Sequence, residues 1–381
     1  MKIALVCSWL NQYGGAERVL EQLHDFYPDA PIYTSMYEPR AMPAFYRNWD
    51  IRTSFLQRVP FVRRYHQLFL SLYPLAFEQF DLSAYDVVLS NTSAFGHGVI
   101  TRPETCHISY CLTPARFLWG FHGYARRENL GGLQRFVLAP LLASLRAWDV
   151  AAAQRVDHFI AISQTIAARI QKYYRRSSTI IHPAIDTSQF RPSDEVDDYF
   201  LVVSRLIPYK RIDLAVEACS RLGLKLKVVG DGRDRVALER LAGPTVEFLG
   251  RRPDAEVKQL FARCRGFLFP GEEDFGLTPL EAQASGRPVL AFAAGGPLET
   301  VVDGQTGLFV HSQTVDAWTD ALARFNAMRW DSAAIRRHAE QFDVRVFKER
   351  LTNFVAQKFA EHRAEPFGRL PEGNLREIPQ Q

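Results

Sequence analysis

The chain has 381 residues, too many for one hydrophobic core, and we expect two domains. With 47% hydrophobic and 23% charged residues it has the composition of a soluble globular protein, and no uninterrupted apolar run reaches the roughly 18 residues of a membrane span. The net charge of +4 is far below what nucleic-acid binding requires, although residues 1–180 carry 19 Lys and Arg against 13 Asp and Glu, an excess that suggests an anionic partner.

Cysteine usage and the N-terminus both indicate a cytoplasmic protein. The five cysteines are odd in number and show neither Cys-x-x-Cys nor histidine-adjacent spacing, so we expect no disulfide framework and no zinc site. The first apolar run, from Ile3, is short and leads directly into Gly14-Gly15, which favours a β-strand over a signal peptide.

Short apolar runs alternate with helical patterns in the first half, as is typical of βαβ units in a parallel sheet. The expected strands are Ile3–Ser8, Pro31–Thr34, Val87–Ser90, His107–Cys111 and His158–Ile162, and the expected helices are Ala16–Phe26, Gln134–Arg155 and Gln164–Tyr173. Gly14 and Gly15 lie between the first strand and the first helix, where glycines let backbone N–H groups approach a ligand closely. An ordinary tight turn is the alternative.

A basic and aromatic segment follows the second strand. It contains Arg52, Arg58, Arg63 and Arg64 among phenylalanine, leucine and valine residues, and no acidic residue lies between Asp50 and Glu78. Such mixtures can contact an anionic membrane surface. The alternative is a helical cover of the first domain whose arginines are solvated.

The texture changes near residue 183, where His182-Pro183 precedes an acidic stretch at 194–198. We interpret this region as a linker between a first domain, 1–183, and a second domain, 184–339, with a flexible tail at 363–381. The expected strands of the second half are Phe200–Ser204, Leu226–Gly230, Val246–Leu249, Gly266–Pro270, Val289–Ala291 and Gly307–Val310, and its expected helices are Arg211–Leu222, Ala255–Ala262, Pro279–Ala284 and Val315–Ala327.

Two cations follow the first strand of this second series. Arg205 and Lys210 stand at the carboxyl edge of the strand, just before a helix, and such edges are where α/β proteins bind ligands. An Arg offers a planar fork to a diphosphate and a Lys a mobile point charge. Cations at a helix N-terminus oppose the helix dipole, so an anion is expected here. The alternative is that Lys210 and Arg211 are simply solvated at the helix start.

The segment from Glu273 to Glu281 carries the strongest signal. It follows the strand at 266–270 and reads as a glycine turn that opens a helix, with a carboxylate at each end. A helix start offers free N–H groups and a positive dipole end to a phosphate, and carboxylates accept hydrogen bonds from hydroxyl groups. Phosphate and polyol together suggest a nucleotide sugar.

The pattern Glu-x-Phe-Gly-Leu-x-Pro-Leu-Glu at 273–281 resembles the signature of glycosyltransferase family 4, whose members are retaining enzymes. The resemblance implies the α/β GT-B fold, in which two Rossmann-like, doubly wound domains face a cleft and a C-terminal helix, here 340–362, crosses back to the first domain. It further implies that Arg205 and Lys210 grip the donor diphosphate, that Glu273 orients sugar hydroxyls and that Glu281 binds the ribose. The other residues that it places around the donor are Gly14, Gly15, Gly230, Arg251, Asp274, Phe275, Gly276 and Leu277.

The chain departs from the family at one position. In the segment Tyr110–Trp119 the family often has a histidine that reaches the donor sugar, where this chain has Leu112, which cannot form a hydrogen bond through its side chain. We expect His97 to substitute as a catalytic residue, although a lone histidine is more often structural. Arg116 is the second candidate to replace that histidine. Together with Thr113 it is expected to contact the acceptor or the sugar.

The resemblance therefore implies a retaining glycosyltransferase that moves a hexose such as mannose from a nucleoside-diphosphate sugar to a glycan or a lipid-linked glycan. The Tyr-Cys-x-Thr-Pro-x-Arg segment at 110–116 suggests the bacterial polysaccharide and O-antigen enzymes. Because cations and N–H groups neutralise the leaving diphosphate, neither a metal nor a cofactor is expected beyond the donor substrate. Three alternatives remain: a nucleotide-sugar epimerase or hydrolase, a non-catalytic nucleotide-sugar-binding module, and a sugar phosphorylase, although the sequence shows no context for the cofactor-bound lysine that a phosphorylase usually needs.

Overall fold

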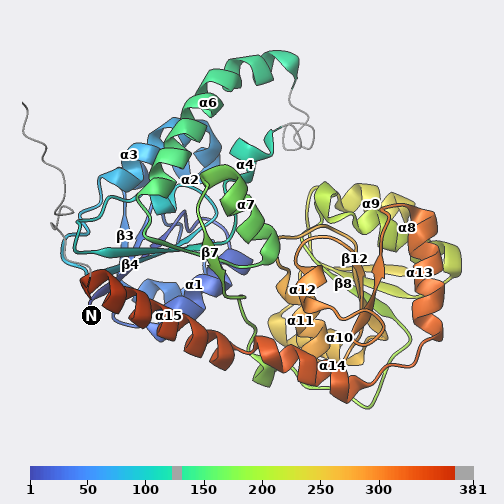
Figure 1. The fold of residues 1–381 in the computed structure, drawn as a ribbon. Helices are drawn as coiled ribbons and strands as arrows, with labels where there is room; N and C mark the ends of the chain where they lie inside the picture. The colour runs from blue at the N-terminus through green and yellow to red at the C-terminus, as the bar shows by residue number, and fades with distance from the viewer. Residues whose placement is uncertain (122–130, 365–381) are drawn as a thin grey trace, which may run out of the picture.

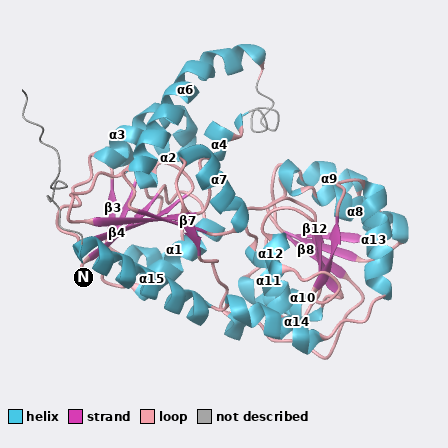
Figure 2. Ribbon diagram, viewed as in Figure 1, coloured by secondary structure: helices cyan, strands magenta, loops and turns pink. Residues whose placement is uncertain are grey.

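The computed structural model of the chain describes residues 1–121 and 131–364. Two parallel β-sheets form the centres of two domains, and helices cover both faces of each sheet (Figures 1 and 2). The first sheet has the order β3 (Ile51–Thr53), β2 (Ile32–Thr34), β1 (Ile3–Cys7), β4 (Val87–Thr92), β5 (Cys106–Cys111), β6 (His158–Ala161) and β7 (Ser178–Ile180). The second has the order β10 (Val246–Gly250), β9 (Leu226–Val229), β8 (Phe200–Val203), β11 (Gly266–Phe269), β12 (Val289–Phe292) and β13 (Gly307–Val310).

The helices alternate with these strands along the chain, as the α/β pattern predicts. Those of the first domain are α1 (Gly15–Phe26), α2 (Val62–Tyr65), α3 (Tyr73–Glu78), α4 (Arg116–Trp119), α6 (Gly132–Gln154) and α7 (Gln164–Tyr174). Those of the second are α8 (Ile212–Leu222), α9 (Arg235–Leu241), α10 (Asp254–Arg263), α11 (Leu277–Ala284), α12 (Pro297–Thr300), α13 (Val315–Ala327) and α14 (Ser332–Ala339).

The last described helix, α15 (Val344–Ala364), returns to the first domain and lies along its lower face in Figure 1. The chain crosses between the domains twice at one place, because Ile185 of the linker pairs with Asp343 just before α15. From there the Phe347 ring packs at 5.5 Å from the Phe26 ring of α1 and at 5.7 Å from the Tyr110 ring of β5. The expected tail, 363–381, lies outside the described residues beyond Ala364.

Helix α6 projects beyond the rest of the first domain (Figure 1). By length and composition alone, its stretch Phe136–Gln154 could cross a membrane, with 28% of the stretch buried inside the protein. The stretch is interrupted by Arg146 and Asp149, and Asp149 is fully buried against the domain. Asp149 accepts hydrogen bonds from Trp119 and Tyr174, and these bonds make the C-terminal half of α6 part of the folded core of the first domain.

Candidate active site

The strand orders of both sheets reverse at their centres, between β1 and β4 in the first and between β8 and β11 in the second. Ligands of α/β proteins bind at such switch points, outside the carboxyl ends of the strands. The loops after β1 and β8 carry Gly14 and Arg205, and the loop after β11 carries Glu273. The topology thus assembles most of the residues that the sequence indicated.

Two helix N-termini meet at the domain interface. Helix α1 begins after Gly14 and α11 begins after Gly276, so neither N-cap residue has a side chain that could cap its helix, and at α1 the carboxylate of Glu17 folds back to accept from the N–H of Gly14. A side chain at Gly276 would be strained because its φ of 88° lies in the left-handed region, while Gly15 has open space where a Cβ would stand. Uncapped N–H groups at the start of a helix favour an anion.

Arg18 of α1 holds these two helices together. Its Nη1 donates to Oε1 of Glu281 on α11 at 2.7 Å. Glu281 is almost completely buried, and burial raises the pKa of its carboxyl group while Arg18 opposes the rise. The expected ribose ligand is therefore placed at the interface and already has a cationic partner, which sequence reasoning missed.

Lys210 and Glu273 form the centre of the site. The Lys210 ammonium pairs with the Glu273 carboxylate, and both side chains are largely buried. Gly271 permits this approach, because a Cβ there would stand only 2.8 Å from Cα of Lys210. The next cation, Arg211, pairs with Asp213 at 3.0 Å in the first turn of α8. The anions expected beside these cations are thus provided by the protein itself.

Glu17 of α1 adds a buried carboxylate that sequence reasoning did not single out. It is 7% exposed, and burial raises the pKa of its carboxyl group to about 7. Hydrogen bonds from its own N–H and from that of Gly14 oppose this rise, as does the charge of Arg205 across the interface. Glu17 stands three residues after Gly14 in a capping-box position, which explains why it folds back on the start of the helix.

Asp274 is not oriented as expected for a donor ligand. Its Oδ2 accepts from Nε of Arg116 at 3.0 Å and its Oδ1 from Nη1 of Arg169 at 2.5 Å, so it binds two arginines of the first domain. Its carbonyl oxygen also accepts from Oγ of Ser163 at 2.7 Å. Asp274 is therefore a tie between the domains, because these bonds already use its carboxylate and its carbonyl.

The structure also places Phe275 and His97. The Phe275 ring is buried in the hinge, stacked at 5.3 Å on the His182 ring, so the contact of this residue with a donor stays a prediction for its backbone. His97 is 3% exposed, and its Nε2 lies 3.3 Å from Oδ1 of Asp149 inside the first domain. His97 therefore cannot substitute for the histidine that the family has at Leu112.

The other expected residues, Gly230, Arg251 and Thr113, have these surroundings in the structure. Packing alone requires a glycine at position 230, because a Cβ there would stand 1.8 Å from the carbonyl oxygen of Ser204. Arg251 is exposed after the edge strand β10. Thr113 is buried, and its hydroxyl accepts from Nη1 of Arg169 at 3.4 Å, so it supports an arginine of the interface.

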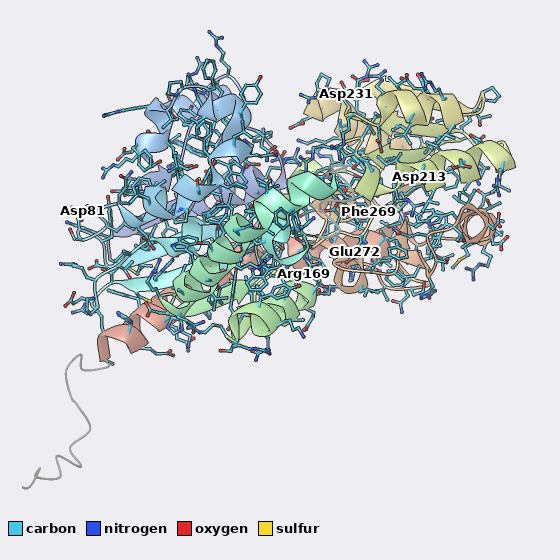
Figure 3. All side chains as sticks on the ribbon, turned by 90° about the horizontal axis from the view of Figure 1, so that it is seen from above. Asp81, Arg169, Asp213, Asp231, Phe269 and Glu272 are labelled. Carbon is cyan, nitrogen blue, oxygen red and sulfur yellow. The ribbon has the colours of Figure 1, made fainter. Side chains whose placement is uncertain are left out.

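A cleft of about 370 Å³ opens beside the Lys210–Glu273 pair. Tyr209 and Arg211, on either side of Lys210 in the chain, line the cleft, as do the two chain neighbours of Glu273. Residues of α4 and α7 form its other side. Figure 3 shows Arg169 of α7 and Glu272 of the second domain close together at the domain junction. Nη2 of Arg169 lies 3.8 Å from Oε1 of Glu272. The lining residues are Pro114, Arg116, Trp119, Gly120, Arg169, Tyr173, Tyr209, Arg211, Glu272, Asp274 and Gln313.

Comparison with known proteins agrees with this geometry. The model of "Glycosyltransferase Family 4" matches residues 13–189, and that of "Glycosyl transferases group 1" matches residues 185–342. A D-inositol 3-phosphate glycosyltransferase of Mycolicibacterium paratuberculosis is 35% identical over 167 residues, which are 38% of this chain and 38% of that relative. The chain thus matches well under half the length of this curated relative.

Two solved structures share the whole fold. HepE of Anabaena, in complex with UDP and glucose, superposes with a TM-score of 0.68 at 19% identity and covers 93% of this chain and 99% of its own. The sucrose-phosphate synthase of Thermosynechococcus elongatus has a TM-score of 0.69 at 19% identity, with 94% and 100% covered.

Two Rossmann-like domains whose switch points face each other, with helix N-termini and cations between them, define the GT-B fold. The two matching family models together span residues 13–342, and the chain belongs to the family-4-like glycosyltransferases.

Proposed function

We propose that the protein is a retaining hexosyltransferase that uses a nucleoside-diphosphate sugar and a glycan or lipid-linked glycan acceptor in cell-surface polysaccharide synthesis. The observation that carries the proposal is the convergence of Lys210, Glu273 and two helix N-termini with glycine N-caps at the switch points. Further support comes from HepE, a neighbour of the same fold that was solved with UDP and glucose.

The proposed mechanism follows from where charge develops. The bond from the anomeric carbon to the diphosphate breaks, a bond to the acceptor oxygen forms on the same face, and the acceptor proton passes to the departing phosphate. The negative charge on the leaving group is stabilised by Arg205, Lys210 and the N–H groups at Leu277. Preorganised donors act in the same way in acyl and phosphoryl transfer. Lys210 exchanges its bond to Glu273 for the diphosphate when the donor binds, before the glycosidic bond breaks, and this releases Glu273 to orient sugar hydroxyls.

The donor class is testable by thermal shift. One of UDP, GDP and ADP, or its sugar conjugate, is expected to stabilise the wild type, since a ligand at 100 times its dissociation constant adds about 2.7 kcal/mol. Lys210→Ala is expected to lose most of that shift, whereas Lys225→Ala, which removes an exposed lysine of the same domain, keeps it. A protein that no nucleotide stabilises, or a Lys210→Ala variant that responds like the wild type, would refute this donor site.

We extend the proposal to peripheral contact with the inner face of the membrane. Phe61 is 77% exposed at a φ of 62° and Leu68 is 79% exposed, with exposed Arg58 nearby in the chain. The charge is smaller than the sequence indicated, because Arg52 pairs with Asp50 and Arg63 with Glu38, at 2.8 and 3.1 Å, and the side chain of Arg64 is outside the described part. Apolar side chains presented beside cations favour an anionic bilayer surface.

Vesicle sedimentation tests this contact. The wild type is expected to pellet with vesicles containing phosphatidylglycerol and to be released by salt, because part of the attraction is electrostatic. Phe61→Asn combined with Leu68→Gln should reduce the bound fraction several-fold, since asparagine tolerates the left-handed backbone at position 61. Val236→Gln, on the exposed face of α9, is the matched control. Equal sedimentation of all three proteins would count against the contact.

A further inference from the structure

The cleft beside the Lys210–Glu273 pair has a lining of two chemical kinds. Three aromatic side chains, Trp119, Tyr173 and Tyr209, give it apolar faces, and three arginines, Arg116, Arg169 and Arg211, give it cations. Among the residues that the structure describes, two carboxylates line it, those of Glu272 and Asp274. Within the described lining the arginines outnumber the carboxylates by one at the point where an acceptor must approach the donor sugar, and Asp213, outside the lining, pairs with Arg211.

The aromatic side of the cleft is held rigidly. Nε1 of Trp119 donates to Oδ2 of Asp149 at 2.7 Å, and the hydroxyl of Tyr174 donates to the same oxygen at 2.9 Å. The Trp119 ring also stacks on the Tyr173 ring at 4.7 Å, with 12° between their planes. Asp149 is fully buried, so the indole is fixed before any ligand binds. A fixed aromatic surface can receive the apolar face of a sugar ring at a low entropic cost.

The cationic side already binds one carboxylate. Asp274 sits between Arg116 and Arg169 and accepts from both guanidinium groups. Planar guanidinium groups match carboxylate and phosphate oxygens in the same fork geometry. Arg211 is held differently, by Asp213 of its own domain and by Gln313, so it does not tie the domains together. Arg211 is thus a third arginine in the cleft, and contact between the domains does not explain its presence there.

We infer that this cleft is the acceptor subsite and that it takes a sugar carrying an anionic group, a phosphate or a carboxylate. The sugar ring packs on Trp119, and the anion binds the arginines beside Asp274. This inference rests on the proposed transferase function, because it assigns the second substrate of the same reaction. Its alternative is that the three arginines serve only to join and brace the two domains.

The test measures binding of four small probes by saturation-transfer NMR in the presence of the nucleotide that stabilises the protein. Glucose 1-phosphate, glucose 6-phosphate and glucuronate are expected to bind at least about tenfold more tightly than methyl glucoside, the difference that one charge-assisted interaction provides. Binding of the two phosphates alone, or of glucuronate alone, would identify the anionic group. Equal binding of all four probes, or no binding of any, would overturn the inference.

Variants locate the effect. Arg211→Gln should reduce the preference for anionic probes several-fold and Trp119→Leu should weaken all four probes, whereas Arg221→Gln, in an exposed ion pair with Asp316, should change neither. A preference that persists in Arg211→Gln and in Arg169→Gln would place the anion elsewhere. Nucleotide thermal shifts are recorded for every variant, so that loss of the acceptor subsite is distinguished from failure of the donor site.

Discussion

Lys210→Ala is expected to slow sugar transfer by about 30- to 1,000-fold, which corresponds to about 2–4 kcal/mol of lost transition-state stabilisation. The Lys210 ammonium pairs with the Glu273 carboxylate. Tyr209 and Arg211, the chain neighbours of Lys210, line the cleft. Because negative charge grows on the diphosphate as the glycosidic bond breaks, a positioned cation is worth more in the transition state than in the ground state. The rate is measured as release of nucleoside diphosphate from the donor that gives the thermal shift.

Removing Lys210 also leaves the Glu273 carboxylate without its partner in a largely buried place. An effect on folding must therefore be separated from an effect on catalysis. Lys210→Arg keeps the charge and should recover part of the rate, while Glu273→Gln should lower the rate with the cation still present. Wild-type turnover in Lys210→Ala, with an unchanged melting temperature, would remove Lys210 from the mechanism.

The fold follows from the sequence wherever a strand is central and buried. The expected central strands all appear, because their apolar runs are buried and covered on both faces. Strands β3 and β7 were not predicted. Each has three residues at a sheet edge, and each is only partly buried, so no apolar pattern distinguishes it from a loop. Helix α9 was missed for a similar reason, since Leu238 is its only buried residue.

The site was predictable only where its chemistry is local in sequence. Lys210 and Glu273 follow adjacent parallel strands, so a strand-by-strand interpretation places them together. Arg18 and Arg169 meet Glu281 and Asp274 over separations of 263 and 105 residues, and only the packing of one domain on the other reveals those pairs. His97 was misassigned because Asp149, which holds it inside the domain, stands on a helix far along the chain.

Glu17 should make the stability of the first domain depend on pH. Its pKa of about 7 lies above the ordinary 4.5, so the folded state binds the proton more tightly than the unfolded state does. The stability that this provides is fully present below about pH 4.5 and is lost as the pH rises through about 7, which amounts to about 2–3 kcal/mol between pH 5 and pH 8. Glu17→Gln stays neutral and can still accept from the N–H of Gly14.

The melting temperature of Glu17→Gln relative to the wild type is therefore expected to rise by about 5–10 °C between pH 5 and pH 8, given the usual shift for a domain of this size. Glu256→Gln, an exposed acid of α10, serves as the control and should show no such trend. A constant difference between Glu17→Gln and the wild type across this range would show that Glu17 ionises normally.

The same carboxyl group links pH to the donor. Glu17 lies at the start of α1 within reach of the Arg205 charge, where the diphosphate is proposed to bind. A bound diphosphate adds negative charge beside it, which raises its pKa further, so nucleotide binding takes up a proton. Nucleotide affinity should consequently fall several-fold as the pH rises from 6.5 to 8 in the wild type and stay nearly level in Glu17→Gln. Calorimetry in two buffers of different ionisation enthalpy measures that proton directly, and an equal proton uptake in the variant would assign it to another group.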